Sequence, residues 1–288
     1  MVMDIRSALS FGTKLLKENG IDSFLDARVL LCHVLNKDEL YLVVHAKDEL
    51  LPEQESLYKE LLERRSKKEP VSYITGHKEF MGLDFSVKSG VLIPRPETEH
   101  IVEYIIENYK DKTIDVLDIC TGSGAIGVSV AHFLEKSCVT CVDISPVALE
   151  TAKLNAQRLG AEDRVTVEEK DALEKMEFNK KFDIVISNPP YIPDDVVLTL
   201  SDDVKNYEPH LALSGGEDGL VFYRAITKNA PSYLKKDGLL IYETGHDMGQ
   251  KVKDIMQHNF KDIKFIKDLA LYDRVVYGFL KKQNGEDI

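Results

Sequence analysis

The 288-residue sequence has no hydrophobic run that approaches the length of a membrane span, and its first ten residues carry no apolar segment after a basic start. It also has no internal repeat and no low-complexity tract. These absences argue against an integral membrane protein, a secreted precursor and a disordered chain. We therefore expect a cytoplasmic protein that folds throughout and has no membrane partner.

Basic residues are scarce relative to acidic ones, 37 against 49, which gives a formal net charge of -12. A field of this sign repels phosphate backbones unless basic side chains are concentrated locally. The charge balance therefore argues against a duplex nucleic acid as a direct partner. The sequence leaves the oligomeric state open, with a monomer as the working expectation.

Cysteine is also sparse, with four residues, at 32, 120, 138 and 141. The last two form a C-x-x-C, but no second such pair exists, and the motif lies in an apolar β-branched run. Buried structural thiols are the favoured interpretation, and no metal site is expected. No H-E-x-x-H, Walker or Ser-His-Asp arrangement offers a competing chemistry.

The amino-terminal part of the chain has a helical pattern of hydrophobic residues from about residue 4 to 68, with one helix expected to begin near Pro52. The charged run 63–69 is typical of a solvated helix end and a domain boundary. Alternating residues over 80–87 then predict a strand. We predict a small helical bundle over 1–70, a β-hairpin linker over 71–93 and a catalytic domain over 94–288.

After residue 112 the pattern changes to strands that alternate with helices, which is typical of a parallel, doubly wound sheet. The last two strands have no helix between them, so they are expected to pair antiparallel at the sheet edge. The predicted fold class is α/β, a Rossmann-like sheet of seven strands. The expected strands span 113–119, 138–144, 165–169, 182–187, 239–243, 263–269 and 274–280.

A glycine-rich turn, Cys120-Thr121-Gly122-Ser123-Gly124, follows the first of these strands. Glycine lets a ligand approach the backbone closely, and the start of a helix offers free N–H groups. Asp143, at the end of the next strand, has the spacing of a ribose-binding carboxylate. This pattern alone fits NAD as well as S-adenosylmethionine. Asp118, just before the turn, would repel a pyrophosphate and attract an ammonium group, which favours the sulfonium cofactor.

Each of these residues has a plainer alternative. The glycine turn could be an ordinary tight connection, and Asp143 could cap the following helix together with Ser145. Asp171 follows the third strand and is placed beside the adenine by topology, because ligands bind at the carboxyl ends of parallel strands. A surface turn explains Asp171 nearly as well.

The fourth strand leads into Asn188-Pro189-Pro190-Tyr191. Two consecutive prolines cannot donate backbone hydrogen bonds, so this turn presents carbonyl oxygens, and Asn188 adds a side-chain acceptor. Such a turn is suited to accept the hydrogens of an NH₂ group and to aim its lone pair at a methyl donor. An ordinary turn is the alternative, since Asn and Pro are common in turns.

The chain closely resembles the HemK-type protein-glutamine N5-methyltransferases, which modify the Gly-Gly-Gln glutamine of peptide-chain release factors. The resemblance spans nearly the whole chain. Its most specific motifs are Leu-Ile-Pro-Arg-Pro-Glu-Thr-Glu at 92–99, Thr-Gly-Ser-Gly-Ala-Ile at 121–126, Ser-Asn-Pro-Pro-Tyr-Ile at 187–192 and Glu-Pro-His-Leu-Ala-Leu at 208–213.

The resemblance implies S-adenosylmethionine as cofactor, S-adenosylhomocysteine as product and a release factor as protein partner, recognised in part by the helical domain. Cofactor contacts would come from the turn Cys120, Thr121, Gly122, Ser123 and Gly124, and from Asp143, Ile144, Asp171, Ala172 and Asn188. The substrate glutamine would be held by Asn188, Pro189, Pro190 and Tyr191, with Arg95, Glu97 and Thr98 in the facing wall. Cys120 and Met248 depart from the residues frequent in the family, which are glycine and glutamine.

Two rival interpretations remain. The first is an adenine-N6 methyltransferase of DNA or RNA, which must also accept both hydrogens of an NH₂ group and uses a similar Asn-Pro-Pro-Tyr turn. The excess of acidic residues and the absence of a long inserted recognition domain argue against it. The second rival interpretation is a noncatalytic binding module that keeps the fold as a scaffold. The intact glycine turn and Asn188 argue against that one.

Overall fold

The computed structural model describes residues 3–21 and 23–282 of the chain. The contacts divide the chain into two compact units. One unit comprises the residues up to His77 together with Ser201–Tyr207, and the other comprises Lys78–Leu200 and the residues from Glu208 onward. The outer ends of the two predicted domains, residues 1–2 and 283–288, lie outside the described residues.

The first unit is helical, and three of its helices begin at a side-chain cap. Asp4, Ser23 and Asp38 each accept a hydrogen bond from a backbone N–H in the first turn, which satisfies a donor that the helix leaves free. The predicted helix start at Pro52 is confirmed. The helices are α1 (Ile5–Glu18), α2 (Phe24–Leu35), α3 (Glu39–Val44), α4 (Pro52–Ser66), α5 (Val71–Thr75) and α10 (Asp202–Lys205).

A two-stranded sheet of β1 (His77–Phe80) and β2 (Leu83–Ser86) follows α5. The predicted β-hairpin is confirmed, but the single strand predicted over 80–87 is wrong, because the chain turns at Met81 and Gly82 and its first strand starts at His77. Met81 and Gly82 both have positive φ, 54° and 72°, and they turn the chain between the two strands. The alternation of polar and apolar residues begins only at Leu83, and Met81 and Gly82 separate it from Phe80.

The second unit contains the predicted seven-stranded sheet, in the order β5-β4-β3-β6-β7-β9-β8. The first five strands are parallel, while β9 pairs antiparallel with both β7 and β8, as the absence of a helix between the last two strands predicted. The strands are β3 (Ile114–Ile119), β4 (Ser137–Asp143), β5 (Val165–Glu169), β6 (Phe182–Ser187), β7 (Leu234–Glu243), β8 (Phe260–Lys267) and β9 (Asp273–Leu280).

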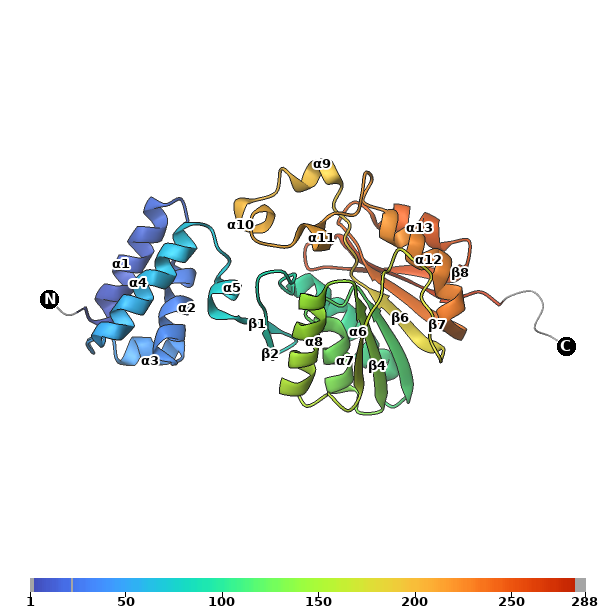
Figure 1. Cartoon of the computed structure of the whole chain (residues 1–288), viewed down its shortest axis with the longest axis horizontal. Coiled ribbons are helices and arrows are strands. Elements are labelled where there is room, and N and C mark those ends of the chain that lie inside the picture. The colour runs from blue at the N-terminus through green and yellow to red at the C-terminus, as the bar shows by residue number, and fades with distance from the viewer. Residues whose placement is uncertain (1–2, 22, 283–288) are drawn as a thin grey trace. The chain divides into compact units, whose positions relative to one another are not determined.

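Helices cover both faces of this sheet (Figure 1). Alternate residues of each strand point to opposite faces, so Val116 packs under α6, α7 and α8, and its neighbour Leu117 packs under α12 and α13. Strands alternate with helices along the chain, and the carboxyl ends of the parallel strands lie at one edge of the sheet. The remaining elements are η1 (Pro96–Thr98), α6 (Glu99–Tyr109), α7 (Ala125–Phe133), α8 (Pro146–Arg158), α9 (Asp194–Val197), α11 (His210–Leu213), α12 (Val221–Tyr233) and α13 (Gly249–Met256).

The cysteines of the C-x-x-C point to different surroundings. Cys141 is buried under the helices of one face, whereas Cys138, near the amino end of β4, is exposed. The expectation of buried thiols is therefore wrong for Cys138, which lies near the amino end of β4 and on the face opposite to Cys141. No helix among the described residues is both long and apolar enough to cross a membrane.

Candidate active site

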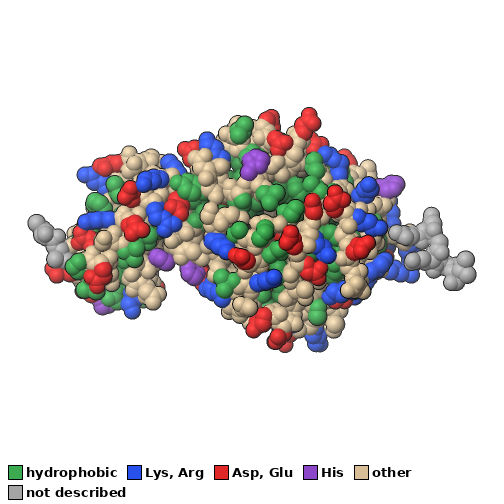
Figure 2. All heavy atoms as spheres, viewed as in Figure 1, with side chains coloured by type: hydrophobic (Ala, Val, Ile, Leu, Met, Phe, Trp, Pro, Cys, Tyr) green, Lys and Arg blue, Asp and Glu red, His purple; other side chains and the backbone are tan. Residues whose placement is uncertain are grey.

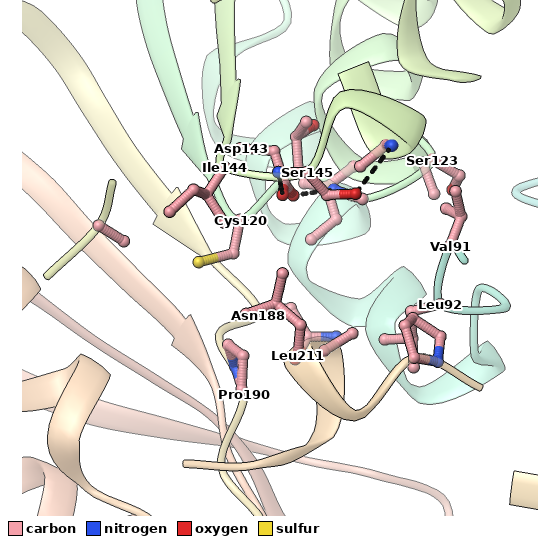
Figure 3. A pocket seen from close by; sticks show the side chains of 18 of the residues that line it. Val91, Leu92, Cys120, Ser123, Asp143, Ile144, Ser145, Asn188, Pro190 and Leu211 are labelled. Atoms are coloured by element: carbon pink, nitrogen blue, oxygen red, sulfur yellow. Dashed lines mark hydrogen bonds between the residues drawn. The ribbon is translucent and has the colours of Figure 1, made fainter. Parts of the chain in front are cut away.

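A cavity at the carboxyl edge of the sheet contains most of the residues predicted to contact a ligand. Ser123, Asp143 and Ser145 lie on one side, and Asn188 and Pro190 lie opposite (Figure 3). All of the lining residues belong to the second unit. Its predicted members are Arg95, Thr98, Cys120, Thr121, Gly122, Ser123, Asp143, Ile144, Asp171, Ala172, Asn188 and Pro190.

The turn after β3 is built from left-handed backbone. Cys120, Gly122 and Gly124 have φ values of 60°, 57° and 80°. A residue with a Cβ rarely adopts this conformation, so Cys120 is locally strained where glycine is frequent in the resembling family. Gly124 does not line the cavity, because it faces α8, where an added Cβ would lie 3.1 Å from the Ala152 Cβ.

Asp118 lies beneath this turn and not at its mouth. Its side chain is fully buried, and its Oδ2 accepts hydrogen bonds from Thr121 Oγ1 at 2.6 Å and from the Gly127 backbone N–H at 3.0 Å. It does not line the cavity, whereas the prediction placed it at the mouth of the turn. Burial raises the pKa of Asp118 to about 7. The acid instead holds the turn from below.

Asp143 joins two turns at the end of β4. Its Oδ2 accepts from the Gly122 N–H and its Oδ1 from the Ser145 N–H, both at 2.9 Å. Ser145, and not Asp143, caps α8 by accepting from the Ala148 N–H. Burial raises the pKa of Asp143, while the hydrogen bonds from Ser145 and Gly122 oppose that rise. Its carboxylate faces the cavity.

Asp171 follows β5 and closes its own turn, because its Oδ1 accepts from the Leu173 N–H at 2.8 Å. Lys170, Asp171, Ala172 and Leu173 all line the cavity, so Asp171 belongs to the site and is also a turn residue. The two interpretations of Asp171, as a residue of the ligand site and as a turn residue, are therefore compatible.

The Asn-Pro-Pro-Tyr corner leaves β6 with Asn188 and Pro190 against the cavity. Pro189 and Tyr191 do not line it. Pro189 is buried, and the Tyr191 ring packs against the core between the sheet and α12. Burial raises the pKa of Tyr191 far above its usual range. Asn188 Nδ2 donates to Thr98 Oγ1 at 3.4 Å.

One wall of the cavity is formed by two segments that lie far apart in the sequence. Glu208, which is buried, forms an ion pair with Arg95 and accepts from the Ile93 N–H at 3.4 Å. Both Arg95 and Thr98 line the cavity, but Glu97 does not. The ion pair holds the strip that follows Glu208 against the rim, and Pro209, Leu211 and Ala212 of that strip line the cavity.

Sequence reasoning missed these apolar lining residues, together with Val91, Leu92 and Phe222. Apolar side chains carry no chemical signal of their own, although two of the motifs that carry the family resemblance contain four of these six residues. It also missed Glu243, the last residue of β7, whose Oε2 accepts from Thr98 Oγ1 at 2.5 Å.

The fold and the site define a methyltransferase of the Rossmann-like class. Residues 110–285 match a family described as methyltransferase domain, and residues 7–76 match the PrmC N-terminal domain. Among solved structures, a methyltransferase from Pyrococcus furiosus aligns with a TM-score of 0.51 at 17% identity, over 69% of this chain and 89% of its own. A likeness at that identity supports the fold alone.

Curated relatives extend over nearly the whole chain. A release factor glutamine methyltransferase from Clostridium acetobutylicum is 47% identical, covering 95% of this chain and 98% of its own length. A protein of the same name from Clostridium botulinum is 41% identical over the same shares of both chains. The chain belongs to the family of release factor glutamine methyltransferases.

Proposed function

We propose that the chain transfers the methyl group of S-adenosylmethionine to the side-chain amide nitrogen of the glutamine in the Gly-Gly-Gln motif of a peptide-chain release factor. The observation that carries the proposal is Asn188, which lines the cavity at the end of β6 and whose Oδ1 accepts no hydrogen bond from the described residues. The names of the relatives support the choice of substrate. A cytoplasmic location belongs to the same proposal.

The residues around the cavity fit this cofactor. A Cβ on Gly122 would meet nothing within 4 Å, so a ligand has room to approach the backbone there. Each Asp143 oxygen accepts one hydrogen bond, and a carboxylate oxygen can accept a second from a ribose hydroxyl. Ile144, Asp171 and Ala172 would flank the adenine. When bound, S-adenosylmethionine supplies an electrophilic methyl group.

The Asn-Pro-Pro-Tyr corner would hold the substrate nitrogen. An amide nitrogen is a poor nucleophile because its lone pair is delocalised into the carbonyl group. Asn188 Oδ1 and the Pro189 carbonyl oxygen would each accept one N–H, which directs the lone pair at the methyl carbon and stabilises the positive charge that develops. Positioning of this kind supplies at most roughly 7–11 kcal/mol in well-oriented systems. Pro190 and the Tyr191 ring support the corner.

The helical unit would contribute to recognition of the release factor, as the family resemblance implies. Several of its large apolar side chains are exposed, among them Leu40, Val43 and Val44, with 69%, 74% and 69% of their surface accessible. Exposed apolar side chains that cluster on one short helix are typical of a protein-binding surface.

The adenine-N6 alternative gains no support from the face of the molecule that Figure 2 shows. Over the catalytic unit in Figure 2, Lys and Arg side chains are interspersed with Asp and Glu side chains and do not gather into a basic stripe. A duplex ligand favours such a stripe, because affinity for nucleic acid comes largely from phosphate contacts.

The test is incubation of the protein with a purified release factor and methyl-labelled cofactor, followed by mass-spectrometric mapping of the labelled residue. We expect the label on the Gly-Gly-Gln glutamine, and we expect Asn188→Ala to abolish transfer while cofactor affinity and melting temperature stay near wild type. Asn108→Ala, an exposed position on α6, is the matched control and should keep full activity. Unchanged turnover in Asn188→Ala would discard the mechanism.

A further inference from the structure

We propose that Glu243 and Thr98 form a positioning relay that fixes which end of the Asn188 amide faces the substrate. The inference rests on the proposed function and adds two residues that act through Asn188. Strands β6 and β7 are parallel neighbours with Ser187 opposite Tyr242, so Asn188 and Glu243 leave adjacent strands at the same edge.

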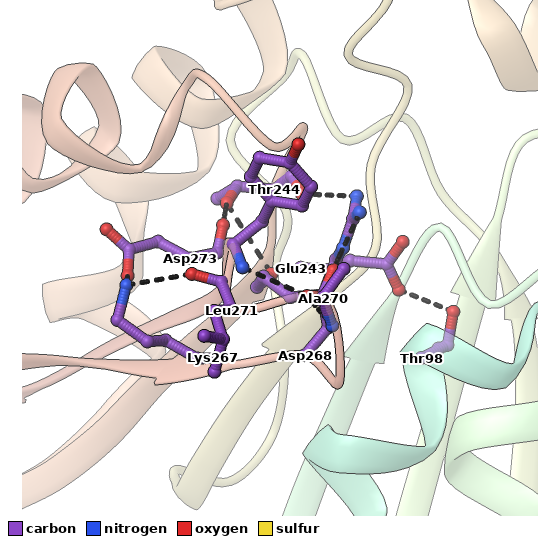
Figure 4. A network of polar contacts seen from close by, with 10 residues as sticks. Thr98, Glu243, Thr244, Lys267, Asp268, Ala270, Leu271 and Asp273 are labelled. Atoms are coloured by element: carbon purple, nitrogen blue, oxygen red, sulfur yellow. Dashed lines mark hydrogen bonds and ion pairs between the residues drawn. The ribbon is translucent and has the colours of Figure 1, made fainter.

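Thr98, at the end of η1, joins the two. Its Oγ1 lies 2.5 Å from Glu243 Oε2 and 3.4 Å from Asn188 Nδ2 (Figure 4 shows the first of these bonds). Thr98 and Glu243 are 4% and 2% exposed, so both groups are largely shielded from bulk water. The acid does not line the cavity and therefore acts through the hydroxyl.

The direction of the relay follows from the number of hydrogens available. An ionised carboxylate only accepts, so Thr98 must give its single hydroxyl hydrogen to Glu243. The only hydrogen of the Thr98 hydroxyl is then engaged with Glu243, and its oxygen can only accept. It therefore accepts a hydrogen bond from the NH₂ end of the Asn188 amide. Asn188 Oδ1 is thereby directed away from Thr98, free to accept an N–H of the substrate.

Protonation of Glu243 reverses this order. A neutral carboxyl group can donate to Thr98, and Thr98 is then free to donate its own hydrogen to the Asn188 Oδ1, which favours the opposite orientation of the amide. The NH₂ end would then face the substrate NH₂ group, and two donors cannot pair. Only the ionised form of Glu243 therefore fixes the productive orientation of the amide.

The surroundings of Glu243 place this change near neutral pH. Burial raises the pKa of Glu243 to about 7, against the lowering effects of the Thr98 hydrogen bond, Arg274 and Arg95, and Glu97 adds to the rise. Arg274 is itself paired with Asp268 at 3.1 Å. The Tyr191 and Tyr223 hydroxyls also face the acid, and the second donates to the Glu243 backbone oxygen at 2.8 Å.

The first test compares Thr98→Val, which keeps the shape and removes the hydroxyl, with Thr98→Ser, which keeps the hydroxyl. Methyl transfer to a purified release factor is measured together with cofactor affinity and melting temperature. We expect kcat to fall up to about a hundredfold in the Val variant, because misplacement of a reacting group by about 1 Å has this effect. The Ser variant should stay within about threefold of wild type, and cofactor affinity should be unchanged in both.

The second test is the pH profile of kcat/KM for wild type and Glu243→Gln, since the acid limb reports a group in the free enzyme. Wild type should lose activity as the pH falls through about 7, and the Gln variant should lose this limb. A wild-type kcat in Thr98→Val, or a wild-type acid limb in Glu243→Gln, would overturn the relay. A wild-type protein that does not methylate the release factor would overturn the proposed function itself, so the two failures are distinguishable.

Discussion

Asp118 and Asp143 lie near the carboxyl ends of neighbouring strands β3 and β4, yet their carboxylates have opposite surroundings. Asp118 is fully buried beneath the glycine turn, while Asp143 lines the cavity. The sequence predicted both positions, because topology places strand ends at one edge. It could not predict the direction of each side chain, which depends on contacts such as that between Asp118 and the Gly127 N–H.

Asp143→Ala should weaken the binding of S-adenosylmethionine by about 10–100-fold, because a hydrogen bond to a charged group contributes about 1.5–3 kcal/mol. Titration calorimetry measures the change. Glu169→Ala is the matched control, since this exposed acid lies opposite Asp143 at the end of the adjacent strand and outside the cavity. An unaltered dissociation constant in Asp143→Ala removes this residue from the cofactor site.

At the scale of elements, the segment between β6 and α12 supports the Asn-Pro-Pro-Tyr corner. Its last glycine, Gly219, has φ 73°, and a Cβ added there would lie 2.3 Å from the Tyr191 carbonyl oxygen. Gly215 approaches the same residue, with its Cβ position 2.7 Å from the Tyr191 Cα. The corner is therefore held by backbone that passes directly against it.

Gly219→Ala should displace the corner and lower kcat at least about tenfold, with cofactor affinity close to wild type, because the corner positions the substrate nitrogen. Gly160→Ala is the matched control: it has φ 66° and nothing within 4 Å of its Cβ position. Both variants should lose about 1–2 kcal/mol of stability from the left-handed backbone. Equal kinetics in the two variants would show that the close contact with Tyr191 has no effect on catalysis.

The elements themselves were largely predictable, because a change from helical to alternating periodicity marks the start of the sheet. The start of β7 could not be predicted from this periodicity. It begins at Leu234, five residues before the predicted 239, and includes the polar residues Lys235 to Asp237. Lys235 is held there by ion pairs with Asp115 and Asp183 at 2.9 and 2.8 Å. Such pairs join strands that are distant in the sequence, so a local pattern cannot predict them.

For the molecule as a whole, two buried acids link stability to pH. Burial raises the pKa values of Asp118 and Glu243 to about 7, above the value of about 4 of an exposed carboxyl group. The native state keeps these protons after the unfolded chain has lost them. Their contribution to the free energy of unfolding is therefore complete below about pH 4 and is lost as the pH rises through about 7.

The free energy of unfolding should accordingly fall between about pH 5 and about pH 7 and level off above about pH 8. Urea denaturation at a series of pH values measures this curve. Asp118→Asn, which cannot ionise, should have a smaller slope over the same interval. A slope identical to that of wild type would mean that Asp118 titrates normally in the native protein.

The grouping of Ser201–Tyr207 with the helical unit has a practical consequence for anyone who wishes to dissect the protein. These residues interrupt the catalytic unit in sequence, and Tyr207 Oη donates to the Lys67 carbonyl oxygen at 2.6 Å. A fragment that ends after residue 77 would lack residues 201–207, which belong to its own unit. The complementary fragment would carry these residues without the helices against which they pack. Expressing the two halves separately therefore truncates both of them.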